Sequence, residues 1–209
     1  MDKLDPDAFP PPIVALARAG GRIGLLGGSF NPAHQAHRHI GMIALRRLKL
    51  DAVWWLVAPQ NPLKSTVGMA PLERRLTKAR EVAAHPDIHA GTPEEALGTR
   101  FTIDTIEALV RQFPKARFVW LMGGDSLASF HHWRRWKAIV KLLPIAVVAR
   151  PGFTVRALAS PAALYLENAR VADDKSASLA DMKAPAWTFI RERLDPTSAT
   201  ALRQRGVWR

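Results

Sequence analysis

The chain has 209 residues, no cysteine, and 30 basic against 18 acidic side chains, which gives a formal charge of +12. Hydrophobic residues make up 48% of it, a share that is typical of a globular chain and excludes general disorder. The lack of cysteine excludes disulfides, thiolate chemistry and cysteine-ligated zinc, and is compatible with a reducing cytoplasm.

The positive charge has more than one interpretation. The basic residues are dispersed along the chain and stand among acidic ones, as in the runs RRLK, ERR and RRWK. This pattern favours a solvated, arginine-rich surface, or a site for small anionic molecules, over a nucleic-acid-binding protein. We therefore expect no nucleic-acid partner.

The N-terminal segment combines acidic residues, a proline cluster and a short apolar stretch. It resembles neither a signal peptide nor a membrane anchor, and no later stretch is long enough to span a bilayer. We predict a loose leader over residues 1–20 and a single domain over residues 21–209. We expect a cytoplasmic location and no membrane partner.

Apolar segments rich in β-branched and aromatic residues alternate with amphipathic segments. The apolar segments predict strands at 22–30, 51–59, 88–92, 116–124 and 143–150, with a weaker candidate at 163–169. The amphipathic segments predict helices at 37–48, 71–84, 102–113 and 126–141. Such alternation is typical of right-handed βαβ units. We predict an α/β fold with a doubly wound, Rossmann-like parallel sheet flanked by helices and a small C-terminal helical portion.

Three predicted strands are followed by segments typical of ligand-binding loops: GGSFNP after the first, APQNPLK after the second and MGGDS after the fourth. In a parallel sheet the carboxyl ends of the strands lie at one edge, where such folds bind their ligands. We therefore expect these segments to form one site.

The segment GGSFNPAHQAH places two glycines, a proline and two histidines between the first strand and the first helix. Gly27 and Gly28 allow a sharp turn and a close approach of main-chain N–H groups to a ligand. His34 and His37 then lie near a helix start, where imidazoles can donate to phosphate oxygens. The segment lacks both the GxGxxG pattern and the lysine of a P-loop.

Two alternatives stand beside a phosphate site. Zinc could bind His34, His37 and His39, but no acid–histidine motif completes a tetrahedral shell. The histidines could also be structural, at the surface or capping the core. We assign no protein metal ligand.

The decapeptide GSFNPAHQAH resembles the G-x-F-(D/N)-P-x-H-x-G-H signature of the nucleotidylyltransferase superfamily, with Ala36 in place of the usual glycine. TSATALR, at 197–203, resembles its I-S-S-T-x-I-R motif, with Ala199 in place of the second serine. NPLK after the second strand, FTIDT and MGGDSLASFHHWRRW resemble bacterial nicotinate-nucleotide adenylyltransferases in particular. The resemblance extends from Arg22 to Arg205.

This resemblance implies transfer of the adenylyl group of ATP to nicotinate mononucleotide in NAD biosynthesis, giving deamido-NAD and pyrophosphate. A phosphate monoester is already a nucleophile, so the enzyme must bring two polyanions together and stabilise charge on the α-phosphate and leaving group. The family implies Mg²⁺ on the phosphates, held largely through water. The alternatives are a sister adenylyltransferase acting on nicotinamide mononucleotide or phosphopantetheine, and a basic nucleic-acid-binding module.

The resemblance also assigns roles to residues. It implies three catalytic residues, which are His34, His37 and Arg203. It implies that ATP is bound by these three and by Gly28, Ser29, Phe30, Asp125, Ser198 and Thr200. It implies a mononucleotide site that contains Lys64, Thr102 and Trp133.

Several of these residues have structural alternatives. Asp125 and Thr102 could cap the helices that they precede. Trp133 and Trp136, three residues apart on a predicted helix, could be a core pair. Ser198 and Thr200 could simply start the last helix, with Arg203 in a surface ion pair.

Overall fold

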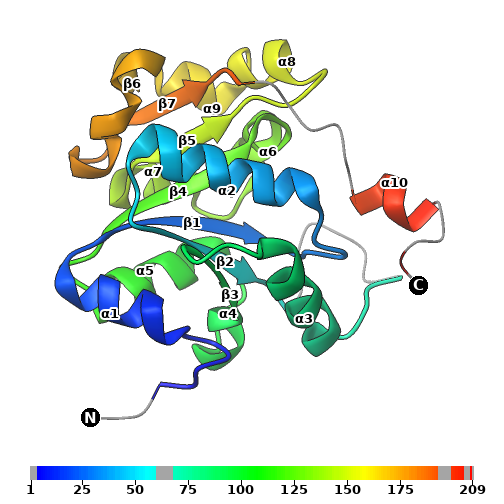
Figure 1. Cartoon of the computed structure of the whole chain (residues 1–209). Coiled ribbons are helices and arrows are strands. Elements are labelled where there is room, and N and C mark those ends of the chain that lie inside the picture. The colour runs from blue at the N-terminus through cyan, green and yellow to red at the C-terminus, as the bar shows by residue number, and fades with distance from the viewer. Residues whose placement is uncertain (1–3, 60–67, 193–198, 205–207, 209) are drawn as a thin grey trace.

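The computed structural model describes residues 4–59, 68–192, 199–204 and 208 (Figure 1). Its centre is a seven-stranded, wholly parallel sheet with the strand order β3-β2-β1-β4-β5-β7-β6. The strands are β1 (Arg22–Gly28), β2 (Ala52–Val57), β3 (Ile88–Gly91), β4 (Arg117–Gly123), β5 (Ile145–Val148), β6 (Arg170–Val171) and β7 (Trp187–Ile190). The chain runs outward from β1 to β3 and then returns to β4 beside β1. This order confirms the predicted doubly wound sheet and sets its switch point between β1 and β4.

Helices and short 3₁₀ turns connect the strands. The α-helices are α1 (Pro11–Ala19), α2 (Gln35–Leu48), α3 (Leu72–Ala83), α4 (Pro93–Ala96), α5 (Thr102–Gln112), α6 (Gly124–Ser129), α7 (Trp136–Leu142), α8 (Thr154–Leu158), α9 (Pro161–Tyr165) and α10 (Ala199–Gln204). The 3₁₀ turns are η1 (Phe130–His132), η2 (Glu167–Ala169) and η3 (Asp173–Asp181). The helices predicted at 37–48, 71–84 and 102–113 are confirmed as α2, α3 and α5.

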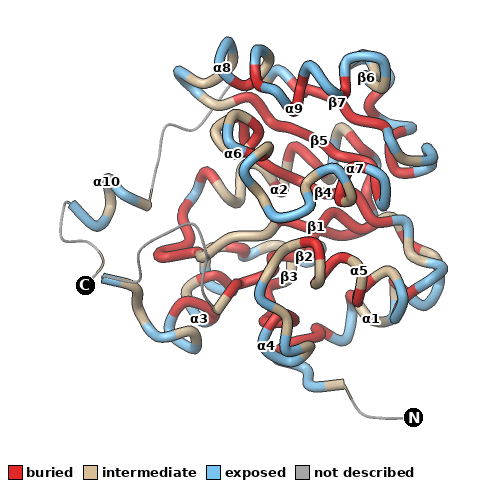
Figure 2. Tube along the Cα trace, turned by 180° about the vertical axis from the view of Figure 1, so that it is seen from behind, coloured by how far each residue is buried: buried red, intermediate tan, exposed pale blue. Residues whose placement is uncertain are grey.

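Two hydrophobic layers cover the two faces of the sheet. All six residues of β2 are buried, because helices pack on both sides of it. Successive side chains point to opposite faces: Trp54 packs in the layer that contains α1 and α5, whereas Trp55 packs in the layer that contains α2 and α3. Figure 2 shows the buried strands at the middle of the molecule, with exposed residues on the outer turns of the helices.

The N-terminal segment differs from the loose leader that we expected. Residues 11–19 form α1, which has Pro11 at its first position and ends at Gly20 in the left-handed conformation. Ile13 and Ala17, four residues apart, are fully buried, and the Phe9 ring lies 5.8 Å from that of Trp54. The prediction is wrong for residues 8–19 because this apolar face packs into the core.

The edge beyond β5 also differs from the prediction. The candidate strand at 163–169 is wrong, since its residues lie in α9 and η2. Ser160 starts this helical segment: its hydroxyl accepts a hydrogen bond from the N–H of Ala163 at 3.2 Å. The edge is instead completed by β7 and β6, neither of which we predicted.

The predicted helix at 126–141 is broken into α6, η1 and α7. The break lies at Trp133, whose ψ of 142° is extended, and at Arg135, whose φ is +50°. Trp133 and Trp136 therefore do not lie on one helix. Instead, the ring of Phe130 contacts both tryptophans, with centroid distances of 5.2 and 5.9 Å.

Within the described ranges, no helix has the length and apolar character needed to cross a membrane.

Candidate active site

The carboxyl ends of β1, β4 and β5 lie side by side and form one edge of the sheet. A pocket opens there, at the start of α2. It is lined by His34, Ala36, His37, His39, Ile40, Gly123, Val148, Ala149 and Arg150. The structure thus brings the histidines that follow the loop after β1 together with Gly123 of the predicted segment after β4. Most of the predicted segment APQNPLK after β2, namely residues 60–64, lies outside the described residues.

The two histidines of the first loop contact each other at the start of α2. His34 precedes the helix, and its N–H donates to Nδ1 of His37 at 3.2 Å. The ring centroids lie 3.9 Å apart. Because Nδ1 of neutral His37 accepts this bond, its proton is on Nε2, so Nε2 is the ring's donor. His37 thus has both a structural contact and a donor atom at a helix start, where the dipole favours anions.

Aromatic packing holds His37 from the core side. The Phe30 ring lies 4.7 Å from that of His37 and stacks on Trp55 at 5.2 Å. Phe30 is 1% exposed, so its side chain supports His37 rather than facing the pocket. Gly27 also serves packing, because a Cβ there would lie 2.6 Å from the ring of Trp120.

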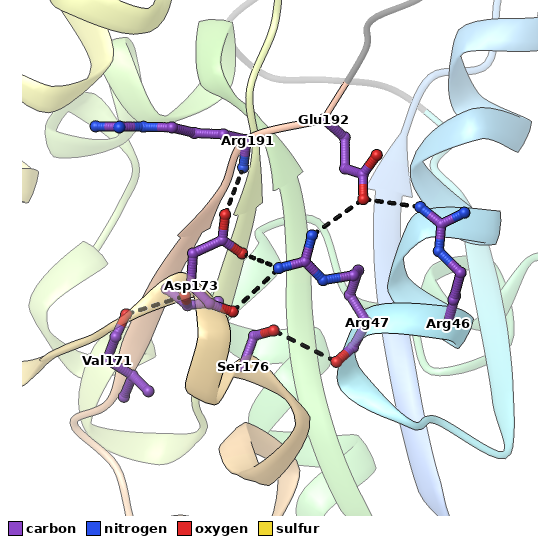
Figure 3. Close-up of polar contacts among 8 residues, drawn as sticks. Arg46, Arg47, Val171, Asp173, Ser176, Arg191 and Glu192 are labelled. Carbon is purple, nitrogen blue, oxygen red and sulfur yellow. Dashed lines mark hydrogen bonds and ion pairs between the residues drawn. The ribbon is translucent and has the colours of Figure 1, made fainter.

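Helix α2 is anchored at its other end by ion pairs (Figure 3). Glu192, which follows β7, accepts hydrogen bonds from Arg46 at 2.8 Å and Arg47 at 3.0 Å. Arg47 also donates to Asp173 of η3. The hydrogen bond from Arg47 contributes most to holding the pKa of Glu192 below its usual value. These contacts join the C-terminal turn of α2 to the end of β7.

The C-terminal segment contacts the first loop at Asn31. Arg203 of α10 donates to the main-chain carbonyl of Asn31, and Trp208 Nε1 donates to its side-chain Oδ1 at 2.8 Å. Arg203 also donates to the hydroxyl of Thr200 at 3.3 Å. The structure therefore places Arg203 and Thr200 beside the loop that carries the histidines. Ser198 lies outside the described residues.

Asp125 forms an ion pair with Arg150 at the pocket. It is not a helix cap: α6 starts after Gly123, and Asp125 lies within the first helical turn. A Cβ on Gly123, two residues earlier, would lie 2.6 Å from Oδ1 of Asp125, so any larger residue there would push this carboxylate out of its present position. We did not predict Arg150. Its signal was the RPG sequence at the end of the fifth predicted strand, at the same sheet edge as the other loops.

The predicted mononucleotide residues lie on neighbouring segments. Thr102 is the first residue of α5, and Phe101 rather than Thr102 occupies the N-cap position. Trp133 is half-buried, with its ring 6.1 Å from Trp120. The guanidinium of Arg134 lies 4.5 Å from the ring of Phe101, the residue before Thr102, and thereby links the two segments. Within the described residues, neither Thr102 nor Trp133 lines the pocket at α2, and Lys64 falls outside that part of the chain.

The donors at the pocket suit phosphates better than a protein-bound metal. Among the described residues there is no group of three or more histidine, aspartate or glutamate side chains that could hold a metal ion. Asp125 is already paired with Arg150. The side chains of His34, His37 and Arg150 offer N–H groups, which bind anions.

Fold and site together define an α/β protein of the class that binds nucleotides at the sheet edge. A family model described as cytidylyltransferase-like matches residues 25–205. A relative from Parvibaculum lavamentivorans is 50% identical over 193 residues, which is 92% of this chain and 96% of the relative. A second relative, from Bradyrhizobium sp. strain ORS 278, is 51% identical over 189 residues, which is 90% of this chain and 98% of the relative. Both carry the name "Probable nicotinate-nucleotide adenylyltransferase". The chain therefore belongs to the cytidylyltransferase-like family and, within it, to the nicotinate-nucleotide adenylyltransferases.

Solved structures share the fold. The Plasmodium falciparum nicotinic acid mononucleotide adenylyltransferase complexed with NaAD matches with a TM-score of 0.66 at 16% identity, covering 88% of this chain and 83% of that one. The same protein complexed with APC gives the same TM-score. These matches confirm the predicted fold class.

Proposed function

We propose that this protein transfers the adenylyl group of ATP to nicotinate mononucleotide, forming deamido-NAD and releasing pyrophosphate. The observation that carries the proposal is the placement of His34 and His37 at the start of α2, with Arg203 of α10 bonded to Asn31 in the loop before them. It occurs in a chain about half identical to relatives named for this activity. Their names favour nicotinate mononucleotide over phosphopantetheine as the acceptor.

The reaction is an in-line displacement. A phosphate oxygen of the mononucleotide forms a bond to the α-phosphorus of ATP, and the bond from that phosphorus to the bridging oxygen breaks. The electron pair leaves with pyrophosphate, and no general base is needed. In this proposal His34 and His37 donate to the triphosphate oxygens, while Arg203 adds positive charge from the C-terminal side. Fixed donors of this kind stabilise charge without reorganising during the reaction.

The remaining ATP contacts follow from position. Gly28, Ser29 and Phe30 contribute main-chain N–H groups. For Phe30 only the main chain is available, because its side chain is buried. Asp125 accepts hydrogen bonds from the ribose hydroxyls, and Arg150 fixes its orientation. Thr200 and Ser198 complete the phosphate contacts from the C-terminal motif.

The mononucleotide site is proposed around α5. Thr102 lies at the start of this helix, where N–H groups and the dipole favour the nicotinate carboxylate. Trp133 offers an aromatic face to the cationic pyridinium ring. Lys64 binds the phosphate of the mononucleotide.

Mg²⁺ is proposed to enter with ATP. The donor set at the pocket fits a metal held by phosphates and water, because its side chains present N–H groups and its carboxylate is paired. Bound there, the ion would neutralise charge on the leaving pyrophosphate.

The cytoplasmic location of the protein also stays a prediction.

Pyrophosphate release tests the proposal. Protein, ATP and Mg²⁺ are incubated with nicotinate mononucleotide or without an acceptor, and pyrophosphate and deamido-NAD are measured together. We expect equal amounts of both products, formed when the acceptor is present. As a control, His85→Ala alters a histidine next to β3, at the opposite sheet edge, and should retain full activity. Pyrophosphate release that does not depend on the acceptor would contradict the proposal.

A further inference from the structure

Arg75 of α3 is a buried cation whose hydrogen bonds go to main-chain carbonyls. It is 1% exposed. Its guanidinium donates to four carbonyl oxygens, which are those of Ala70 at 2.9 Å, Ser29 at 2.6 Å, Ala58 at 2.6 Å and Pro59 at 2.9 Å. These acceptors come from the turn after β1, the segment after β2 and the residues before α3.

Burying this charge is costly, because desolvation disfavours the charged form and lowers the pKa of Arg75. The four acceptors are neutral, so they solvate the cation without cancelling its charge. Arginine suits such a site, since its planar group carries five N–H donors in a fixed arrangement. A position that served only to fill the core would be filled more easily by an apolar side chain.

The guanidinium lies where the sheet ladder between β1 and β2 ends. The last main-chain hydrogen bond between the two strands runs from the N–H of Ala58 to the carbonyl of Gly28, at 2.9 Å. One residue further along, Arg75 joins the carbonyls of Ser29 and Ala58 through a single nitrogen, Nη1. The side chain thus continues the link between the two segments where their main chains separate.

This link holds the start of the segment 29–34, which leads from β1 to His34 at the start of α2. Ser29 precedes Phe30, which adopts a left-handed φ of +45° and packs against His37. The next residue, Asn31, accepts from Arg203. With four donors occupied by carbonyls and 1% exposure, Arg75 acts on the site through the loop rather than by touching a substrate.

We propose that Arg75 is a positioning residue for adenylyl transfer: it joins the loop after β1 to the segment after β2 and thereby holds His34 and His37 in their reactive positions. The inference rests on the proposed function. It assigns to this chain a residue whose loss misplaces the phosphate donors without removing any of them.

The test compares two variants with a matched control. Arg75→Met keeps the length of the side chain and removes every donor, whereas Arg75→Lys keeps the charge but cannot reach four carbonyls. Leu76→Ala is the control, because Leu76 is the next residue of α3 and is buried in the core layer instead. Kinetics are measured at a temperature where circular dichroism shows all the proteins folded.

We expect kcat to fall by at least about tenfold in Arg75→Met and by less in Arg75→Lys, since small displacements of catalytic groups have large effects on rate. The KM for ATP should change less than kcat does. Leu76→Ala should lower the Tm while its kcat stays within about twofold of the wild type. A kcat in Arg75→Met that falls no further than in Leu76→Ala would overturn the inference. If Arg75→Met does not fold, the same comparison with Arg75→Lys decides.

A second readout does not depend on activity. Hydrogen–deuterium exchange of the amides of residues 29–34 should be faster in Arg75→Lys than in the wild type and unchanged in Leu76→Ala. Unchanged exchange in the arginine variant would contradict the positioning role. An inactive wild type together with faster exchange in that variant would instead refute the proposed reaction and leave the role of Arg75 in the loop standing.

Discussion

Arg150 pairs with Asp125 across the edge of the sheet where β5 and β4 end. Both side chains are partly exposed, at 27% and 32%. An ion pair of this exposure contributes about 0–1 kcal/mol to folding. The ion pair therefore matters less for stability than for the orientation that Arg150 gives to the Asp125 carboxylate beside the pocket.

This pairing predicts separate effects on binding and stability. If Asp125 accepts hydrogen bonds from the ribose, Asp125→Ala should raise the KM for ATP by about tenfold or more, as expected for a lost hydrogen bond to a charged group. The Tm should change little. Steady-state kinetics and thermal unfolding of the same preparation check this. An unchanged KM for ATP would remove Asp125 from the nucleotide site.

His37→Ala should leave folding nearly intact and lower kcat by on the order of 10²-fold, as expected for a lost transition-state donor. Because Nδ1 of His37 accepts from the N–H of His34, some stability is also lost, on the order of 1 kcal/mol. A variant with a lower Tm and the kcat of the wild type would show that His37 only caps α2.

Arg203→Ala should reduce kcat/KM for ATP far more than it changes stability, because Arg203 is exposed on a short helix. Gln204→Ala, on the next and equally exposed residue, is the matched control and should behave as the wild type. Equal kcat/KM values in the two variants would place Arg203 outside the site. Ala199→Ser, which restores the family's serine, should be tolerated, and a loss of activity there would show that the motif is misaligned.

Glu94 predicts a pH dependence of stability. It is 7% exposed, and burial raises its pKa from 4.5 to about 7. The folded state therefore binds more protons than the unfolded state between these values, so stability falls as the pH rises through this range. At about 1.4 kcal/mol per pKa unit, the charged carboxylate destabilises the native state by about 3 kcal/mol above about pH 8.

Urea unfolding at pH 5 and pH 8.5 checks this effect. We expect Glu94→Gln to gain about 2–3 kcal/mol over the wild type between the two pH values, because glutamine cannot ionise. Glu95→Gln, on the exposed neighbouring residue, should show no such gain. Parallel pH profiles for the wild type and Glu94→Gln would contradict the raised pKa.

The parts of the fold that follow from local pattern could be predicted from the sequence. The strands of 22–30 and 51–59 are confirmed because an apolar run bounded by turn residues, as in RIGLLGG and AVWWLV, has few other stable conformations. The prediction of one continuous helix over residues 126–141 is wrong, because the packing of Trp133 and the left-handed conformation of Arg135 override the helical pattern. Residues 187–190, which form β7, follow the 3₁₀ turn η3 instead of an amphipathic helix, so the alternation of strands and helices does not mark them as a strand.

The residues of the candidate site likewise fall into those that the sequence predicts and those that only the fold reveals. The histidines and the C-terminal arginine stand in contiguous motifs, so a single sequence predicts them. Arg150 and Arg75 act through partners 25 and 46 residues away, and sequence spacing carries no sign of those contacts. Arginines are common in this chain, so neither stands out until the fold brings its partners to it.

Trp133 provides a prediction for the second substrate. If its ring stacks on the pyridinium, Trp133→Ala should raise the KM for nicotinate mononucleotide by about five- to tenfold and leave the KM for ATP unchanged. Its edge-on contacts with Phe130 and Trp120 also predict a lower Tm. A rise in both KM values, or in that for ATP alone, would contradict this assignment.

The most direct test of the central claim is acceptor choice. The protein is assayed with ATP and Mg²⁺ against nicotinate mononucleotide and nicotinamide mononucleotide side by side, and kcat/KM is determined for each from pyrophosphate release. The two acceptors differ by one carboxylate charge, and in the proposed site the start of α5 lies where its N–H groups would meet that charge. We predict a preference for the acid of at least about tenfold, which corresponds to about 1.4 kcal/mol. Equal efficiency, or a preference for the amide, would contradict the nicotinate assignment.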